Sequence, residues 1–167
     1  LCLEGCIVTI DAMGTQKDRT KAIINKKADY ILQVKGNQQA LLDNISLYFK
    51  EEVLQRDKKV LEAENKYYKE ICFEHGRKEV REYYVENDVM WLNKNCPGWE
   101  KLNGIGACIS KITEKGRRFL CTPLLITILP CRSGITIKTM YIFYSKHTLN
   151  QKSASLSMPT KVRAAVC

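Results

Sequence analysis

The sequence predicts an α/β protein, because apolar strand patterns alternate with amphipathic helix patterns along its first third. Residues 6–11 form a short run rich in β-branched side chains, as expected for a strand covered on both faces. A helix pattern follows this run, and a second strand and a second helix come next. Two strands joined by a helix normally lie parallel in one sheet, with a right-handed crossover. We therefore expect a strand-helix-strand-helix unit at the start of the chain.

Each element of this unit has a local signal. Apolar residues at helical spacing predict a helix over residues 17–27 and a second one from residue 38 to about residue 55. Residues 29–34 read as the second strand, and the following turn contains Gly36. Asn37 is expected to cap the second helix. In parallel sheets functional groups gather at the carboxyl ends of strands, so these two turns are where a site is expected.

The pattern changes after residue 60, where strands without intervening long helices dominate. Residues 66–73 and 78–85 are rich in Tyr, Val and Ile and predict a β-hairpin. A further strand is expected at residues 105–112. A boundary near residues 57–66 would therefore separate α/β from antiparallel β structure.

The last third of the chain differs in charge. Residues 1–114 contain 18 basic and 18 acidic residues, whereas residues 115–167 contain nine basic residues and no acidic one. The net charge of +9 thus belongs entirely to residues 115–167, and such a basic segment favours nucleic acid or an anionic surface. A strand at residues 120–129 is expected to be interrupted by Pro123, and no periodicity follows it.

Composition excludes several classes of protein. With 45% hydrophobic and 27% charged residues, the chain is typical of globular proteins. No apolar run approaches the ~18–20 residues of a transmembrane helix, and no secretory signal is evident, so we expect no membrane partner and a cytoplasmic location. The eight cysteines include no C-x-x-C pair, and we expect them to act as small apolar residues, not as zinc ligands. Phosphate-loop, dinucleotide and serine-hydrolase motifs are missing too.

Asp11 is the candidate metal ligand and catalytic residue. It follows an apolar strand, and a carboxylate at such a place is costly unless it binds a cation or a hydrogen-bond donor. Mg²⁺ takes one or two carboxylates together with phosphate oxygens, as two-metal phosphoryl transfer requires. The alternative is that Asp11 starts the following turn or caps a helix.

Five other residues are candidates for binding DNA. Lys35, Asn37 and Gln38 combine a cation and two amides next to a helix N-terminus, which favours phosphate. His75 and Arg77 lie in the turn of the predicted hairpin and could contact a phosphate backbone. A solvated lysine with a helix cap, and an exposed strand face, would produce the same patterns.

Three motifs together resemble a known family. Residues 6–16 (CIVTIDAMGTQ), 29–38 (DYILQVKGNQ) and 75–81 (HGRKEVR) occur in this order and at the expected spacing. Together they are similar to the DDE transposases of the bacterial H-repeat-associated insertion-sequence group. The resemblance extends over residues 3–114, where residues 99–112 match a later strand of the family.

The resemblance implies a partial ribonuclease-H-like core at residues 1–60, a β-rich insertion at 61–114 and a degenerate basic tail at 115–167. It implies Mg²⁺-dependent cleavage and transfer of DNA strands, with transposon ends as the partner, and leaves an oligomer of the intact enzyme open. Asp11 would be the second carboxylate of the Asp-Asp-Glu triad. The first Asp and the Glu of the family have no counterpart here, so we expect this polypeptide to be inactive alone.

The chain begins with Leu and opens on an apolar segment, so we expect it to be a piece of a longer protein. The abrupt loss of acidic residues after Glu114 leads us to expect a shift of reading frame near residues 115–120. Two other interpretations stay open: a non-catalytic DNA-binding module that uses the basic tail and the insertion strands, and a non-functional remnant.

Overall fold

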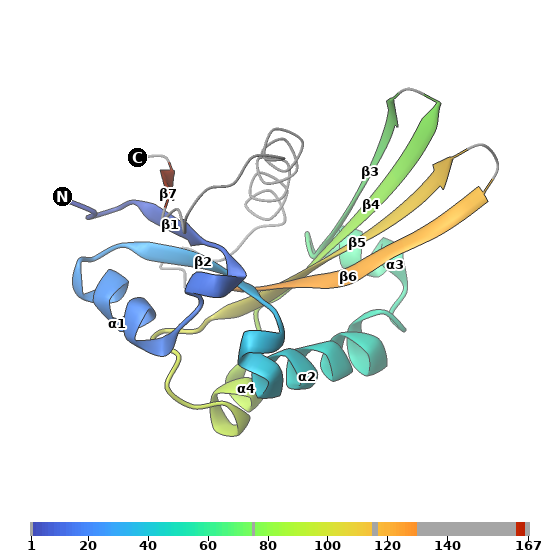
Figure 1. Ribbon diagram of the computed structural model, residues 1–167. Helices are drawn as coiled ribbons and strands as arrows, with labels where there is room; N and C mark the ends of the chain where they lie inside the picture. Colours follow the sequence, from blue (N-terminus) through green and yellow to red (C-terminus); the bar gives the residue numbers. More distant parts are fainter. Residues whose placement is uncertain (1, 75, 115–116, 130–162, 166–167) are drawn as a thin grey trace.

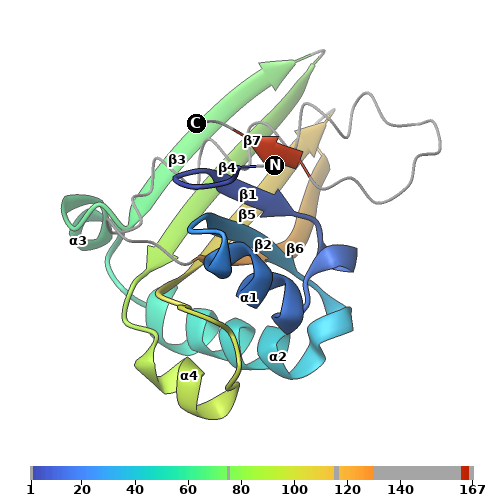
Figure 2. The same cartoon turned by 90° about the vertical axis from the view of Figure 1, so that its left-hand side faces the viewer.

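The computed structural model describes residues 2–74, 76–114, 117–129 and 163–165. In these residues the strands form one mixed sheet, and Figures 1 and 2 show it from two sides. The elements in chain order are β1 (Ile7–Ile10), the 3-10 helix η1 (Ala12–Gly14), α1 (Lys17–Asn25), β2 (Asp29–Val34), the 3-10 helix η2 (Gly36–Gln38), α2 (Gln39–Tyr48), the π-helix η3 (Phe49–Val53), α3 (Lys58–Ala63), β3 (Tyr67–Glu74), β4 (Arg77–Glu86), α4 (Met90–Asn95), β5 (Gly104–Glu114), β6 (Arg117–Leu129) and β7 (Arg163–Ala165).

The predicted parallel pair is confirmed. β1 lies parallel to β2, with Ile7 opposite Asp29 and Ile10 opposite Leu32. The strand order across the sheet is β3-β4-β5-β6-β2-β1-β7, and every other pair is antiparallel. The carboxyl ends of β1 and β2 therefore meet at one edge, which places the turns at residues 11–16 and 35–38 side by side.

The helices follow the predicted spans with differences at their ends. α1 buries Thr20 and Ile23, as the helical spacing predicts. The second predicted helix consists of α2 and the π-helical turn η3, in which the amide of Leu54 bonds the carbonyl of Phe49 at 2.8 Å. The predicted capping role of Asn37 is wrong: Gln38 is the residue before α2, without a side-chain cap, and the amide of Asn37 bonds elsewhere.

The predicted hairpin is confirmed as β3 and β4, which pair without interruption from Tyr67–Tyr84 to Glu74–Arg77. The expectation that Pro123 interrupts the last strand is wrong. β6 continues through it, and the ladder with β5 shifts register between Cys108 and Ser110, opposite the segment that contains Pro123. Because the shift leaves extra residues on β6 without a direct partner, the strand accommodates a residue that has no amide hydrogen.

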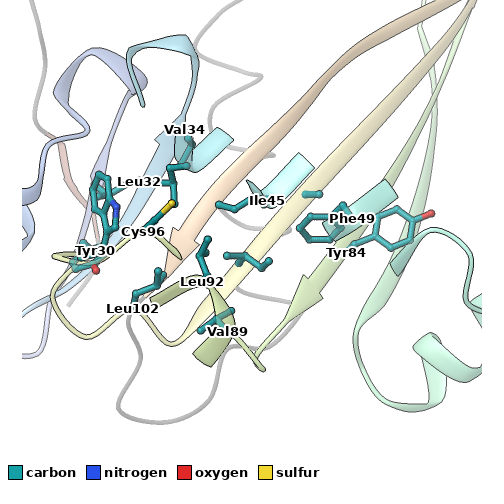
Figure 3. Close-up of a cluster of buried hydrophobic side chains, with 14 of the residues drawn as sticks. Tyr30, Leu32, Val34, Ile45, Phe49, Tyr84, Val89, Leu92, Cys96 and Leu102 are labelled. Carbon is teal, nitrogen blue, oxygen red and sulfur yellow. The ribbon is translucent and has the colours of Figure 1, made fainter. Parts of the chain in front are cut away.

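One hydrophobic cluster joins the two parts of the chain. Helices α1, α2 and α4 lie on one side of the sheet (Figure 1). Buried side chains from β2, α2, η3, β4 and α4 meet in this cluster, among them Leu32, Ile45, Phe49, Tyr84 and Leu92 (Figure 3). The boundary predicted near residues 57–66 thus falls at α3, between two segments that share one sheet and one core. No helix in the described part of the chain is both long enough and apolar enough to cross a membrane.

The prediction of a degenerate, frame-shifted tail falls mostly on residues 115–116, 130–162 and 166–167, which lie outside the described residues. Within the described part, β6 occupies a central position between β5 and β2. Residues 117–129 are therefore part of the sheet and not an appendage to it.

Candidate functional site

Asp11 is half-buried and directly follows β1. Its carboxylate oxygen Oδ1 accepts a hydrogen bond of 3.1 Å from the amide of Gly14, so Asp11 caps the 3-10 helix η1. This is the alternative role that the sequence pattern leaves open for Asp11. A cap leaves a carboxylate with further lone pairs, because each carboxylate oxygen can accept more than one bond. Capping and binding a cation are therefore compatible.

Thr15 ties this turn to the next strand. Its side chain is fully buried, and its hydroxyl bonds the carbonyl of Gln33 at 2.7 Å and the carbonyl of Asp11 at 3.1 Å. The contact with Gln33 connects the end of β1 with the end of β2. Thr15 thus fixes the backbone of Asp11 relative to β2.

Asn37 and Gln38 hold the same turn from the other side. The Nδ2 atom of Asn37 donates to the carbonyl of Ala12 at 2.5 Å, and the Nε2 atom of Gln38 donates to the carbonyl of Thr15 at 3.1 Å. Both amide groups were predicted to bind phosphate. In the structure each of them donates one hydrogen bond that positions the turn at residues 11–16, called the Asp11 turn below. Their role in binding DNA stays a prediction.

Gly14 lies at the most crowded point of this turn. A Cβ atom there would overlap the side chain of Ile10 and would lie 2.7 Å from Nη1 of Arg19 and 3.5 Å from Oδ1 of Asp11. Glycine is needed here because of this close packing. The same geometry brings the guanidinium of Arg19, on α1, beside the Asp11 turn. Sequence reasoning missed Arg19, whose one signal is its place in the first half of the helix that follows the turn.

Lys35 directly follows β2 and its side chain is exposed. Asp11, Lys35, Asn37 and Gln38 therefore lie at one edge of the sheet, as the parallel arrangement of β1 and β2 predicts. Arg19 places a cation beside the turn at residues 11–16, and Lys35 places a second one at the same edge of the sheet. This edge therefore combines cationic, amide and carboxylate groups.

Arg77 is not part of this edge. It begins β4 and is exposed at the end of the β3–β4 hairpin, which extends away from β1 and β2 (Figure 1). His75 lies outside the described residues. The structure thus separates the predicted DNA-binding positions into a group at the Asp11 edge and one residue on the hairpin.

A second charged cluster lies at the base of the hairpin, and sequence reasoning missed it. Glu82 on β4 is buried, pairs with Lys58 of α3, and accepts bonds from Nζ of Lys111 at 2.9 Å and from the hydroxyl of Tyr67 at 2.8 Å. Burial alone would raise the pKa of Glu82, but these three donors outweigh it and lower the pKa to about 2. The cluster fastens α3 to the hairpin and is structural.

Three of the cysteines whose burial the structure describes, Cys6, Cys96 and Cys108, are buried as predicted, whereas Cys72 is half-buried and Cys2 is exposed. Burial raises the pKa of Cys108 to about 12, so its thiol stays protonated at neutral pH. A role as small apolar residues fits these three positions.

Asp11 lies at the start of the turn after β1, and Asp18 lies in the first turn of the following helix α1. No group of three or more His, Cys, Asp or Glu side chains that could hold a metal ion occurs in the described part of the chain. Within the described residues Asp11 is thus not a member of such a group. It can serve as one ligand of a site that other segments complete.

Comparisons with known proteins give related sequences. The chain is 42% identical over 87 residues to "Putative transposase YncI" of Escherichia coli K12, a match that covers 52% of this chain and 33% of that protein. The protein of the same name from Escherichia coli O157:H7 matches with the same identity over 21% of its own length. An uncharacterized protein encoded in the dhlA 3' region of Xanthobacter autotrophicus is 34% identical over 100 residues, which are 60% of this chain and 31% of that protein.

The chain thus spans a third or less of the length of these curated relatives. No family model matches it, and no solved structure does. What the comparisons establish is a relationship to proteins named as transposases over about half of the chain.

Proposed function

We propose that this chain is part of an insertion-sequence transposase of the DDE type, an enzyme that cuts and joins DNA strands. The identity of 42% to YncI over 87 residues carries this proposal. The three motifs around Asp11, Lys35 and Arg77 support it, because together they resemble the H-repeat-associated group. A ribonuclease-H-like core is proposed on the same ground.

The geometry of the Asp11 edge suits contact with a DNA backbone. Asp11 is held by the amide of Gly14, and its turn is fixed by Thr15 and Asn37, so the carboxylate has little freedom to move. Arg19 beside this turn and Lys35 at the same edge of the sheet place positive charge there, which favours a phosphodiester at this edge. We assign to Asp11 the role of a preorganised acidic ligand beside a bound phosphate.

Mg²⁺ is the metal that this assignment implies, and in the intact enzyme it would activate the attacking oxygen and stabilise the leaving one. Asp11 would be one of its ligands. The described residues contain no group of three or more potential metal ligands, so we propose that the other carboxylates come from outside residues 2–114. The isolated chain is then inactive.

A strand-cleavage assay tests the inactivity of the isolated chain. Purified chain is incubated with labelled duplex DNA and either Mg²⁺ or Mn²⁺, and nicked products are measured. No cleavage above background is expected. Cleavage that disappears in Asp11→Asn but persists in Glu4→Gln would show that this chain has a complete active site. Glu4 is a suitable control because its pair with Lys27 is exposed.

The DNA that flanks the coding sequence tests the assignment to transposases. We expect a reading frame upstream that encodes a strand ending in Asp, and a frame downstream that encodes a Trp- and Glu-bearing helix. In a gene restored across these frames, Asp11→Asn should lower DNA cleavage at least a hundredfold, while Glu4→Gln leaves it unchanged. Flanking frames that encode neither element would refute the proposal.

A non-catalytic DNA-binding module is the second candidate, and the nine basic residues after Glu114 favour it. Removal of residues 115–167 would be a poor test, because it also removes the central strand β6. Changing Lys138, Lys146, Lys152 and Lys161 together to Gln leaves β6 intact. If the tail binds DNA, this variant shows weaker affinity and a flatter dependence on salt. Unchanged binding would exclude the tail as the binding element.

A further inference from the structure

The β3 strand forms one end of the sheet in the described residues (Figure 1). Val85 donates to the carbonyl of Lys66 at 2.9 Å, so these two residues are a hydrogen-bonded pair. Hydrogen-bonded and non-hydrogen-bonded pairs alternate along an antiparallel ladder. Tyr67, Lys69, Ile71 and Phe73 consequently direct their backbone N–H and C=O groups away from β4, to the outer edge.

This edge has features that favour pairing with another strand. β3 pairs with β4 over eight consecutive positions without a bulge, and it contains no proline. Ile71 is 47% exposed and Phe73 is 72% exposed, both on the same side of the strand. Long regular edges with exposed apolar residues are templates for intermolecular pairing.

We propose that β3 is a self-association surface, at which two copies of this chain pair their β3 strands antiparallel about a twofold axis at Ile71. The paired strands would join the two sheets into one. Three residue pairs would exchange about six backbone hydrogen bonds across the axis.

The charges in the strand select this register. In the dimer, residues whose backbone groups point to the outer edge must lie opposite one another. This condition allows a twofold axis at any residue from 69 to 73. An axis at Lys69 or at Glu70 would put like charges directly opposite, which is unfavourable. An axis at residue 72 or 73 would bring fewer outward-facing residues into pairs. The axis at Ile71 gives the longest pairing without opposed like charges.

The side chains at this register complement one another. Ile71 would face Ile71 of the second copy, and Lys69 would lie opposite Phe73 of the second copy. The chain already contains a contact of this second kind, since Nζ of Lys78 lies 5.5 Å from the ring centroid of Phe73. Pairing would thus cover the exposed apolar side chains of β3 with an apolar partner and a cation. A second copy of the chain is therefore the occupant that fits this edge.

Sedimentation velocity of the full chain, free of nucleic acid and over about a hundredfold range of concentration, tests the proposal. We expect a monomer–dimer equilibrium. Ile71→Lys and Ile71→Glu should each weaken dimerisation about tenfold or more, because like charges then meet at the axis. An equimolar mixture of the two variants should restore the dimer, since Lys and Glu face each other across the axis.

Leu47→Lys is the matched control, because Leu47 is 61% exposed on α2 and lies far from β3 in sequence. It should dimerise like the unmodified chain. A cooperative thermal melt shows that each variant folds, and Ile71→Thr replaces any charged variant that does not. A chain that stays monomeric, Ile71 variants that dimerise normally, or a mixture that does not recover would overturn the proposal. Because no DNA or activity is involved, failure here would leave the proposed function untouched.

Discussion

The side-chain amide of Asn37 donates a hydrogen bond of 2.5 Å to the carbonyl of Ala12, which lies 25 residues earlier in the chain. This bond fastens the turn after β2 to the turn after β1, next to Asp11. The position of the Asp11 carboxylate therefore depends on a residue of the following turn.

Replacing Asn37 by Ala should lower the free energy of unfolding by about 1 kcal/mol, because a partly buried carbonyl loses its donor. Chemical denaturation measures the change. Asn44→Ala is the control, since both side-chain bonds of Asn44 are exposed: its amide donates to the carbonyl of Ala40 within α2 at 2.8 Å, and its Oδ1 atom accepts from Asn95 at 3.3 Å. Ala has the higher helix propensity, so this variant should be neutral or slightly more stable. An equal loss of unfolding free energy in Asn37→Ala and Asn44→Ala would contradict the assigned role of Asn37.

Replacing Gly14 by Ala should destabilise the protein by about 1–3 kcal/mol, because the new methyl group would overlap the side chain of Ile10 and crowd Arg19. Thermal unfolding provides the measurement. Gly36→Ala is a matched change in the neighbouring turn, where the nearest atom to the new Cβ is Oε1 of Gln39 at 3.5 Å. That is an ordinary contact, and the variant should unfold at or slightly above the temperature of the unmodified chain.

Thr15→Val should cost about 1–2 kcal/mol of unfolding free energy, since the shape is kept while the carbonyl of Gln33 loses its hydroxyl donor in a buried place. Thr15→Ser keeps the hydroxyl and loses a methyl group. If the hydrogen bond dominates, urea denaturation should find the Ser variant the more stable of the two. A Val variant as stable as the unmodified chain would show that the bond to Gln33 contributes nothing.

Glu82→Gln should lower the unfolding free energy by about 2 kcal/mol at neutral pH, because Lys58 and Lys111 lose the buried carboxylate between them. The pKa of Glu82 in the folded chain is about 2, below the ordinary value of 4.5. Below pH 4.5 the unfolded chain binds a proton at this position that the folded chain does not, so the contribution of Glu82 falls as pH decreases toward 2.

The unfolding free energies of Glu82→Gln and of the unmodified chain, measured from pH 3 to pH 7, should therefore differ most above pH 5 and converge in acid. Glu4→Gln serves as the control, because the exposed pair of Glu4 with Lys27 contributes little. A difference between Glu82→Gln and the unmodified chain that is the same at every pH would contradict the lowered pKa.

Local patterns were sufficient to predict most elements of the fold. β-Branched runs indicated β1 and β2, helical spacing indicated α1 and α2, and two segments rich in Tyr, Val and Ile indicated the β3–β4 hairpin. Pro123 misled the prediction, because local propensity does not include the register shift that lets β6 pass through it. Asn37 misled it as well, since Gln38 is the residue that directly precedes α2. The side-chain amide of Asn37 instead donates to the carbonyl of Ala12 in another turn.

The position of the candidate site could be predicted from the sequence, but the residues that hold the Asp11 turn in place could not. A strand-helix-strand pattern was enough to place Asp11 and Lys35 at one edge, because parallel strands share an edge for their carboxyl ends. Arg19, Thr15 and Gln33 could not be assigned to it. Their contacts depend on the angle at which α1 and β2 meet the turn, and a single sequence does not contain that angle.

The sequence by itself determined the alternation of strands and helices, the acidic residue after the first strand and the separation of charge along the chain, because each depends on neighbouring residues alone. The tertiary structure decided which donors hold the Asp11 turn, how Glu82 is compensated and which strand lies at the edge of the sheet. These contacts join residues far apart in the chain, and they form only when packing of the shared core brings the strands and helices together.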